Sequence, residues 1–374
     1  MVLQRKHCLL VPYVALAFAL AVPASAASPN EAIVPQPKNV IPTPKAIPAQ
    51  QTPQTAQPKH LLVSPLEQLP VYKRTPDLPE NADLAYGAFQ RGWYLTALAL
   101  ATKFAQNGDR EAQTLIGVIY ESGRGVAKDK AKAKLWYELA AKSGDNKAAL
   151  RLGVLLLQGE PSTAEKQVAV TYLEQAAKVE LPEALFNLAL LYAEGDAVPQ
   201  NLKKSQDLLE RAAEAGEVEA MYQLALSYLA QSQDTSEIPE FDPLQAQLRG
   251  AFWMGRAARR EHISAQVHYG TLLFKGEGVV PNESEAADWF QRAAEAGNPI
   301  AMNRLARLYA NGRGRPIDLV EALAWQSHAS ALGIKDSELE ELASSLSLEQ
   351  QEDVLDRAKE LAQRLMLPRI SFTN

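Results

Sequence analysis

Residues 111–144 read EAQTLIGVIYESGRGVAKDKAKAKLWYELAAKSG, and this stretch predicts two helices joined by a tight turn. In the first helix, Ile116 and Ile119 recur with other apolar residues at helical spacing and define one apolar face. The turn GRGV ends this helix, because glycine accepts the left-handed backbone that satisfies the last carbonyl groups. A second amphipathic helix carries Trp136 and ends at Gly144. The unit is therefore a helical hairpin.

This pattern returns along the chain with a period of 36 residues. One marker series runs through Trp136, Tyr172, Leu208, Trp253, Trp289 and Trp325, with nine extra residues before its fourth member. A second series, at the end of each hairpin, runs through Gly144, Glu180, Gly216, Glu261, Gly297 and Gly333. A repeat of this length is typical of stacked helical units, in which each unit buries its apolar face against its neighbours.

Other positions recur in the same phase and predict helix starts and close contacts. A short polar side chain before a helix accepts the free amide hydrogens of its first turn. The predicted N-caps of the second helices are Asp129, Glu165, Asn201, Asn282 and Asp318. Small residues mark contacts with no room for a larger side chain, at Gly117, Gly153, Ala189, Ala225, Gly270 and Ala306.

The phrases LIGVIY, GRGV, KLWY and AAKSG in residues 115–144 resemble the Sel-one-like repeat (SLR), a relative of the tetratricopeptide repeat. Similar phrases return in residues 269–297, and the resemblance covers roughly residues 82–333. It implies an all-α fold, a right-handed α-solenoid of Sel-one-like or tetratricopeptide-like helical hairpins. We expect about seven hairpins in residues 81–335 and capping helices in residues 336–366.

Three segments depart from the repeat pattern. Residues 82–108 lack the glycine-rich loop and turn instead at Arg91-Gly92-Trp93, which suits an N-terminal cap. The nine extra residues lie in a polar segment within residues 231–243. The sequence SLEQ at residues 347–350 is a predicted capping box that opens a final helix ending near Leu365.

The first eighty residues are predicted to precede the folded part. Residues 1–26 have a basic start, an apolar stretch and a small-residue cleavage site at Ala24-Ser25-Ala26, as in a secretory signal peptide. We expect cleavage near Ala26 and a location outside the cytoplasm, either periplasmic or secreted. An uncleaved signal anchor is the alternative. Residues 27–80 are rich in proline and predict a disordered linker, which is either a passive spacer or a segment offered to a partner.

Composition excludes several kinds of function. Cleavage would remove Arg5 and Lys6 but no acidic residue, so the net charge of −6 would become −8. An acidic protein of this kind is a poor candidate for binding nucleic acid, and no integral membrane segment would remain. Cleavage would also remove Cys8, the only cysteine, and with it any disulfide or thiolate chemistry.

No catalytic constellation is recognisable in the sequence. His262 and His268 are six residues apart and lie off a common helical face, without a third ligand at metal-binding spacing. The G-x-G pairs each end a helix and are too short to cradle a phosphate. We therefore predict no metal site, no cofactor and no enzyme activity.

A candidate partner groove follows from the resemblance, because tetratricopeptide folds bind ligands on the first helix of each hairpin. Its predicted residues are Leu150, Val154, Phe186, Leu190, Tyr222, Leu226, Val267 and Arg307. They are apolar in the middle of the series and polar at its C-terminal end, which suits a peptide segment with apolar anchors. The alternative is that packing between repeats already uses many of them.

The leading hypothesis is an exported scaffold or adaptor that binds another protein of the cell envelope, as the resemblance implies. Such a role includes regulation of a sensor or of an export complex. The alternative is a cell-wall-directed enzyme or a β-lactam-binding protein, by analogy with cysteine-rich relatives of the family. That analogy is weak here, because the mature chain would contain no cysteine.

Overall fold

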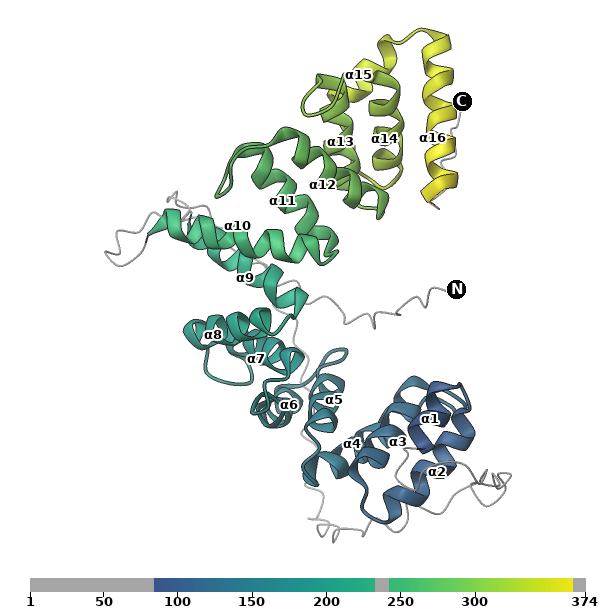
Figure 1. The fold of residues 1–374 in the computed structure, drawn as a ribbon, viewed down its shortest axis with the longest axis vertical. Helices are drawn as coiled ribbons and strands as arrows, with labels where there is room; N and C mark the ends of the chain where they lie inside the picture. Colours follow the sequence, from purple (N-terminus) through teal and green to yellow (C-terminus); the bar gives the residue numbers. More distant parts are fainter. Residues whose placement is uncertain (1–83, 233–241, 366–374) are drawn as a thin grey trace, which may run out of the picture. The chain divides into compact units, whose positions relative to one another are not determined.

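The computed structural model describes residues 84–232 and 242–365, and the regular structure within these residues is entirely α-helical (Figure 1). This confirms the all-α class predicted from the helical periodicity. The predicted signal peptide, the proline-rich segment and most of the polar insertion lie outside the described residues. Within the described ranges, no helix combines the length and the apolar character needed to cross a membrane.

The chain divides into two compact units between Trp136 and Tyr137, inside the fourth helix. The described residues form sixteen helices in tandem. They are α1 (Leu84–Gln90), α2 (Tyr94–Gln106), α3 (Arg110–Ser122), α4 (Lys130–Lys142), α5 (Asn146–Leu156), α6 (Thr163–Ala177), α7 (Pro182–Glu194), α8 (Leu202–Glu214), α9 (Val218–Gln231), α10 (Pro243–Arg259), α11 (Ile263–Lys275), α12 (Glu283–Glu295), α13 (Pro299–Asn311), α14 (Leu319–Ala331), α15 (Ser337–Ser345) and α16 (Leu348–Leu365).

The first unit is built around α1, α2 and α3, which contact one another in chain order. The α1–α2 turn falls at residues 91–93, as predicted. Asp109 caps α3 by accepting the amide hydrogens of Glu111 and Ala112 at 2.9 and 3.0 Å. The guanidinium of Arg124, in the loop after α3, lies over the rings of Phe89 and Tyr94.

The second unit contains five hairpins, in which α5, α7, α9, α11 and α13 each pack against the helix that follows. Each second helix up to α12 also contacts the first helix of the next hairpin, so the hairpins follow one another in a series (Figure 1). Apolar side chains are buried along this series. Helix α16 packs on α14. The predicted capping box of α16 is confirmed: the Ser347 amide donates to Gln350 Oε1, and the Gln350 amide donates to Ser347 Oγ.

Four of the five predicted N-caps are confirmed. Asp129, Asn201, Asn282 and Asp318 each accept an amide hydrogen from the residue three positions later, at 2.9–3.1 Å. The prediction for Glu165 is wrong. Ser162 caps α6 instead, and Glu165 accepts the Ser162 amide hydrogen at 3.0 Å. The helix therefore begins three residues earlier than the repeat phase indicates, with Glu165 as the reciprocal member of a capping box.

The residue that ends each hairpin has a left-handed backbone in all six predicted positions. Gly144, Gly216, Gly297 and Gly333 have φ values of 87–100°, which glycine adopts without steric cost. Glu180 and Glu261, at the other two positions, have φ values of 56° and 66° and are the non-glycine residues with positive φ in the described part of the chain. The repeat therefore imposes a left-handed backbone at this turn even at glutamate, for which this conformation is sterically unfavourable.

The tryptophan series lies in the interior. Trp253, Trp289 and Trp325 are all buried, and Trp325 is only 1% exposed. The indole Nε1 of Trp289 donates to Glu285 and that of Trp325 donates to Glu321, so the polar end of each ring is satisfied on its own helix. The prediction that the evenly spaced indole rings are buried is confirmed.

Small residues allow the helices of a hairpin to approach closely. A Cβ on Gly153 of α5 would lie 2.6 Å from Leu173 of α6, and one on Gly270 of α11 would lie 2.9 Å from Phe290 of α12. The second glycine of a G-x-G loop is equally confined: a Cβ on Gly278 would lie 2.5 Å from the carbonyl oxygen of Gln247. These glycines are therefore required by close contact, as the repeat phase predicts for the first two.

We expect Gly278→Ala to destabilise the protein more than Gly297→Ala. Both substitutions place a Cβ on a left-handed backbone, at a cost of about 1 kcal/mol. Nothing lies within 4 Å of a Cβ at Gly297, whereas the overpacked site at Gly278 adds about 1–3 kcal/mol. Chemical denaturation followed by circular dichroism measures the difference, and equal effects would show that the loop relaxes around the added methyl group.

We expect Trp289→Ala to lower the free energy of unfolding by about 3–5 kcal/mol, because it leaves a cavity between neighbouring helices. Trp93→Ala is the matched control, since Trp93 is 48% exposed and its loss should cost less than about 1 kcal/mol. Denaturant titration of both variants tests this. A Trp289→Ala variant that unfolds at the wild-type denaturant concentration would contradict the buried role of this ring.

Candidate protein-binding surface

The predicted groove residues lie on the first helices of successive hairpins in the second unit. They occupy two equivalent positions one helical turn apart on α5, α7 and α9, and single positions on α11 and α13. We call this set the first-helix ladder. It consists of Leu150, Val154, Phe186, Leu190, Tyr222, Leu226, Val267 and Arg307.

Burial divides the ladder into three groups. Five members are half-buried and therefore keep apolar surface in contact with solvent: Leu150, Val154, Phe186, Leu190 and Leu226. Tyr222 and Val267 are buried, so in this structure they offer little surface to a partner. Arg307 is exposed. Whether a partner binds the ladder stays a prediction, and the half-buried members are the ones that remain available for it.

Tyr222 is buried because it fills the space between α9 and α11. Its ring stacks on the imidazole of His262, with centroids 4.3 Å apart and the planes 29° from parallel. His262 is the N-cap of α11: its Nδ1 accepts the Ala265 amide hydrogen at 3.0 Å, and its Nε2 lies 3.0 Å from the Glu219 carboxylate. This aromatic and polar contact joins two neighbouring hairpins.

The charges around this contact shift two neighbouring carboxyl groups in opposite directions. The hydrogen bond from His262 lowers the pKa of Glu219. Burial raises the pKa of Glu217, with a smaller contribution from the nearby carboxylates of Glu183 and Glu219. Glu217 is also the N-cap of α9, where its side chain accepts the Glu219 amide hydrogen. Both groups therefore have structural roles.

Further along the series, α13 carries a half-buried cation, Arg304, which contacts α11. Arg304 donates to the Thr271 hydroxyl and lies over the ring of Phe290, 5.6 Å from its centroid. No carboxylate within the described ranges is at ion-pair distance from Arg304, and burial lowers its pKa. A guanidinium in this state has donors that suit an incoming carboxylate.

His268 lies beside this arginine. Its outer edge is exposed, but the ring packs against Tyr222, and this partial burial lowers the pKa of the imidazole. Its Nδ1 donates to the Ser264 carbonyl at 2.9 Å, which leaves Nε2 as a hydrogen-bond acceptor. Arg304 and His268 therefore give this part of the surface both a cationic donor and a neutral acceptor.

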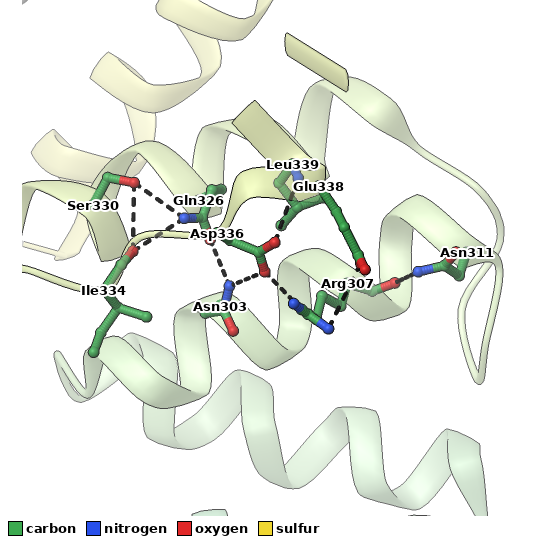
Figure 2. Close-up of polar contacts among 9 residues, drawn as sticks. All are labelled: Asn303, Arg307, Asn311, Gln326, Ser330, Ile334, Asp336, Glu338 and Leu339. Carbon is green, nitrogen blue, oxygen red and sulfur yellow. Dashed lines mark hydrogen bonds and ion pairs between the residues drawn. The ribbon is translucent and has the colours of Figure 1, made fainter. Parts of the chain in front are cut away.

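The C-terminal end of the ladder is held by a polar network within the chain (Figure 2). Asp336, the N-cap of α15, is only 4% exposed. Its carboxylate accepts hydrogen bonds from Arg307 Nε at 2.6 Å and from Asn303 Nδ2 at 2.7 Å. Asn303 also donates to Gln326 Oε1 at 2.8 Å, and Gln326 donates to the Ile334 carbonyl. Arg307 is thus engaged by the chain itself.

The network stabilises the ionised form of Asp336. Burial by itself would raise the pKa of this carboxyl, but the hydrogen bonds from Arg307, Asn303 and the Leu339 amide outweigh it, and the pKa is lowered. A carboxyl whose pKa is lower in the folded state contributes stability above its unfolded pKa. That contribution is lost as the pH falls through the folded-state pKa.

Sequence reasoning missed the roles of His262 and Asp336. His262 follows the hairpin-ending residue at the position where other repeats carry Asp145 and Asn298, both N-caps. The equivalent position in the repeat could therefore have predicted that His262 caps a helix. For Asp336, the following Ser-Glu-Leu suits a helix start, but its contact with Arg307 joins residues 29 positions apart and leaves no pattern in the sequence.

The described residues contain no group of three or more His, Cys, Asp or Glu side chains arranged to hold a metal ion. An open hollow of about 380 Å³ lies elsewhere, between α14, α15 and α16, and Leu323 and Val354 contribute to its lining. It is separate from the first-helix ladder.

Comparison with known proteins identifies the repeat. The Sel1 repeat matches residues 110–145, 146–178, 182–217, 263–298 and 299–333. The chain therefore contains five Sel1 repeats, which confirms the resemblance seen in the sequence. The hairpin α9–α10 lies between the third and fourth matched segments. A comparison with curated proteins gives no match.

Solved structures with a similar fold include the following two. One is a protective antigen of uropathogenic Escherichia coli strains that displays an SLR fold, with 23% identity and a TM-score of 0.63 over 78% of this chain. This chain covers 66% of that protein, just under two thirds of its length. The other is a Sel1 repeat protein from Oxalobacter formigenes, with 26% identity and a TM-score of 0.56. The match covers 66% of this chain and 98% of that protein.

We expect Asp336→Asn to lower the free energy of unfolding by about 1–3 kcal/mol at pH 7, because it removes charge-assisted hydrogen bonds from a buried acceptor. The difference from wild type should begin to shrink as the pH falls below about 4, where the carboxyl of the unfolded chain becomes protonated, and should be lost as the pH falls through the lower pKa of the folded state. Urea denaturation of both proteins between pH 7 and pH 3 measures this. A difference that does not change with pH would contradict the role assigned to the carboxylate charge.

Proposed function

We propose that this protein is a non-enzymatic scaffold that binds a segment of a partner protein along the first-helix ladder. Support comes from the half-buried apolar members on three successive first helices: Leu150 and Val154 on α5, Phe186 and Leu190 on α7, and Leu226 on α9. Because they recur at equivalent positions, their apolar surface follows the repeat and suits a linear segment with several anchors. This recurrence is the observation that carries the proposal.

The chemistry beyond the apolar members suggests what the partner segment contains. Arg304 is half-buried and has no carboxylate at ion-pair distance within the described part of the chain. A carboxylate of the partner would satisfy its donors in a partly desolvated setting. Arg307 is engaged by Asp336, so we assign it to the internal network and not to the partner site. The proposed segment therefore combines apolar anchors with an acidic group.

The titratable groups next to the ladder support a binding role over a catalytic one. The carboxylates of Glu217 and Asp336 cap helices, and the His262 imidazole does the same while it contacts Glu219. Each of these groups already has a structural hydrogen bond to satisfy. A binding surface uses the remaining apolar atoms and donors without disturbing them.

We further propose that the scaffold acts outside the cytoplasm, in the cell envelope, and assists assembly or regulation of a complex there. This rests on the signal-peptide pattern of residues 1–26 and on the proline-rich character of residues 27–80. After cleavage, residues 27–80 would form an N-terminal arm in front of the repeat units, either a spacer or a segment offered to a partner. Sequencing the N-terminus of the protein recovered from cell fractions tests the location, and a protein that keeps residues 1–26 in the cytoplasm would contradict it.

The ladder is tested by the triple substitution Phe186→Ala, Leu190→Ala and Leu226→Ala. These residues are half-buried, so the variant should fold, and circular dichroism checks that it does. A photo-crosslinking residue at position 190 in cells should capture the partner, whereas one at the exposed Val168 of α6 should not. We expect the triple variant to bind that partner at least about tenfold more weakly. A folded triple variant with wild-type affinity would refute the ladder as the binding surface.

A further inference from the structure

Helix α10 carries an exposed apolar stripe on its solvent side. Leu244, Leu248 and Phe252 are 59%, 42% and 55% exposed, and they follow one another at intervals of four residues. At the rise of an α-helix, the stripe is roughly 12 Å long. The opposite side of α10 is used for packing, since Trp253, Met254 and Ala257 are buried there. The stripe is therefore surface that the fold of this unit leaves uncovered.

The same solvent side of α10 is basic. Arg249 and Arg259 are exposed beside the stripe, Arg256 is half-buried, and Arg260 is exposed directly after the helix. Residues 243–260 contain no acidic residue. In a chain with a net charge of −6, this concentration of positive charge belongs to one helix. The face combines apolar and cationic groups and carries no carboxylate of its own.

These four arginines differ from most others in the unit. Six arginines elsewhere form ion pairs with carboxylates: Arg211, Arg307, Arg313, Arg315, Arg357 and Arg364. In the ranges that the structure describes, no carboxylate lies at ion-pair distance from the arginines of α10 or from Arg260. Arg249 lies over Tyr228, Arg256 lies over Trp253, and Arg259 lies over Tyr269. Such stacking positions a guanidinium and leaves most of its N–H donors available.

The repeats themselves provide an internal reference for this face. Phe252 occupies the position that holds Asp207 on α8 and Asp288 on α12. Arg259 corresponds in the same way to Glu214 and Glu295. All four acidic residues are exposed, so both second helices that flank α10 are acidic at these positions. On α10 an apolar residue and a cation stand there instead, whereas α6, one hairpin further toward the N-terminus, carries Thr171 and Lys178.

We propose that the outer face of α10 is a second docking surface, which binds an acidic amphipathic helix of a partner protein. Apolar side chains of that helix would cover Leu244, Leu248 and Phe252, and its carboxylates would pair with Arg249, Arg256 and Arg259. Charge complementarity carries the choice of partner, because each unpaired guanidinium gains a charge-assisted hydrogen bond. This surface is distinct from the first-helix ladder, and the inference goes beyond the proposed function.

The neighbouring repeats favour a protein segment over an anionic membrane. A membrane is a broad surface, and it would meet Asp207 and Glu214 on one adjacent hairpin and Asp288 and Glu295 on the other. Their charge opposes approach to anionic lipid. A single helix fits the width of this face.

Two designed peptides test the proposal with the full-length chain. Both are helical with leucine at every fourth position; in one the flanking residues are glutamate, and in the other they are lysine. We expect the acidic peptide to bind at least about tenfold more tightly in fluorescence anisotropy. The double substitution Phe252→Asp and Arg259→Glu, which installs the residue types of the neighbouring repeats, should weaken that binding at least about tenfold.

Control variants separate this surface from others. Val280→Asp replaces an apolar residue that is 83% exposed outside α10 and should leave the acidic peptide's affinity unchanged. The triple substitution in the first-helix ladder should also leave it unchanged, so the two proposals succeed or fail separately. Equal affinity for the two peptides, or an unchanged affinity of the α10 double variant, would overturn the inference. So would binding to phosphatidylcholine–phosphatidylglycerol vesicles that depends on Phe252 when the acidic peptide does not bind.

Discussion

Close packing between helices at small residues is the constraint on which the second unit depends. Gly153 and Gly270 lie where a Cβ would meet a large side chain of the paired helix, and alanine fills the equivalent positions in other hairpins. This approach brings the apolar faces of two helices into contact and leaves the tryptophan position to fill the space between them. Because each hairpin packs only on its neighbours, a change of sequence in one hairpin affects the contacts within that hairpin and with the adjacent ones.

Charged groups in this framework fall into two kinds. Some are fully engaged within the chain, such as Asp336 with Arg307 and Asn303, or His262 with Glu219. Others, such as Arg304 and the arginines of α10, lack an acidic partner in the part of the chain that the structure describes. Arg304 and Arg256 are half-buried, and a half-buried cation without a counter-charge is costly, which is why we propose a partner carboxylate for each. This distinction separates residues that stabilise the fold from residues that we propose to contact a partner.

Several features were predictable because they follow from local backbone geometry. The left-handed turn after each hairpin requires glycine or a tolerated substitute, and this recurs visibly, even at Glu180 and Glu261. N-caps at Asp129, Asn201, Asn282 and Asp318 follow the same phase. The prediction failed at Glu165 because the preceding loop departs from the repeat, and Ser162 became the better cap. Where the period is broken, phase alone does not locate a helix start.

The all-α class, the hairpin unit, its period and the burial of the indole rings were predictable from the order of residues, because these features depend on contacts within one repeat or between adjacent repeats. The first-helix ladder was predicted from the resemblance to tetratricopeptide folds and stays a prediction as a binding surface. Which ladder members remain available to a partner became known from the helix packing: Tyr222 is buried because it stacks on His262 of the next hairpin, and the exposed Arg307 is paired with Asp336, the N-cap of α15. The structure likewise shows that, among residues 84–232 and 242–365, no carboxylate lies at ion-pair distance from the arginines of α10. Such pairings join separate helices, and their distances depend on how those helices pack and not on the order of residues along the chain.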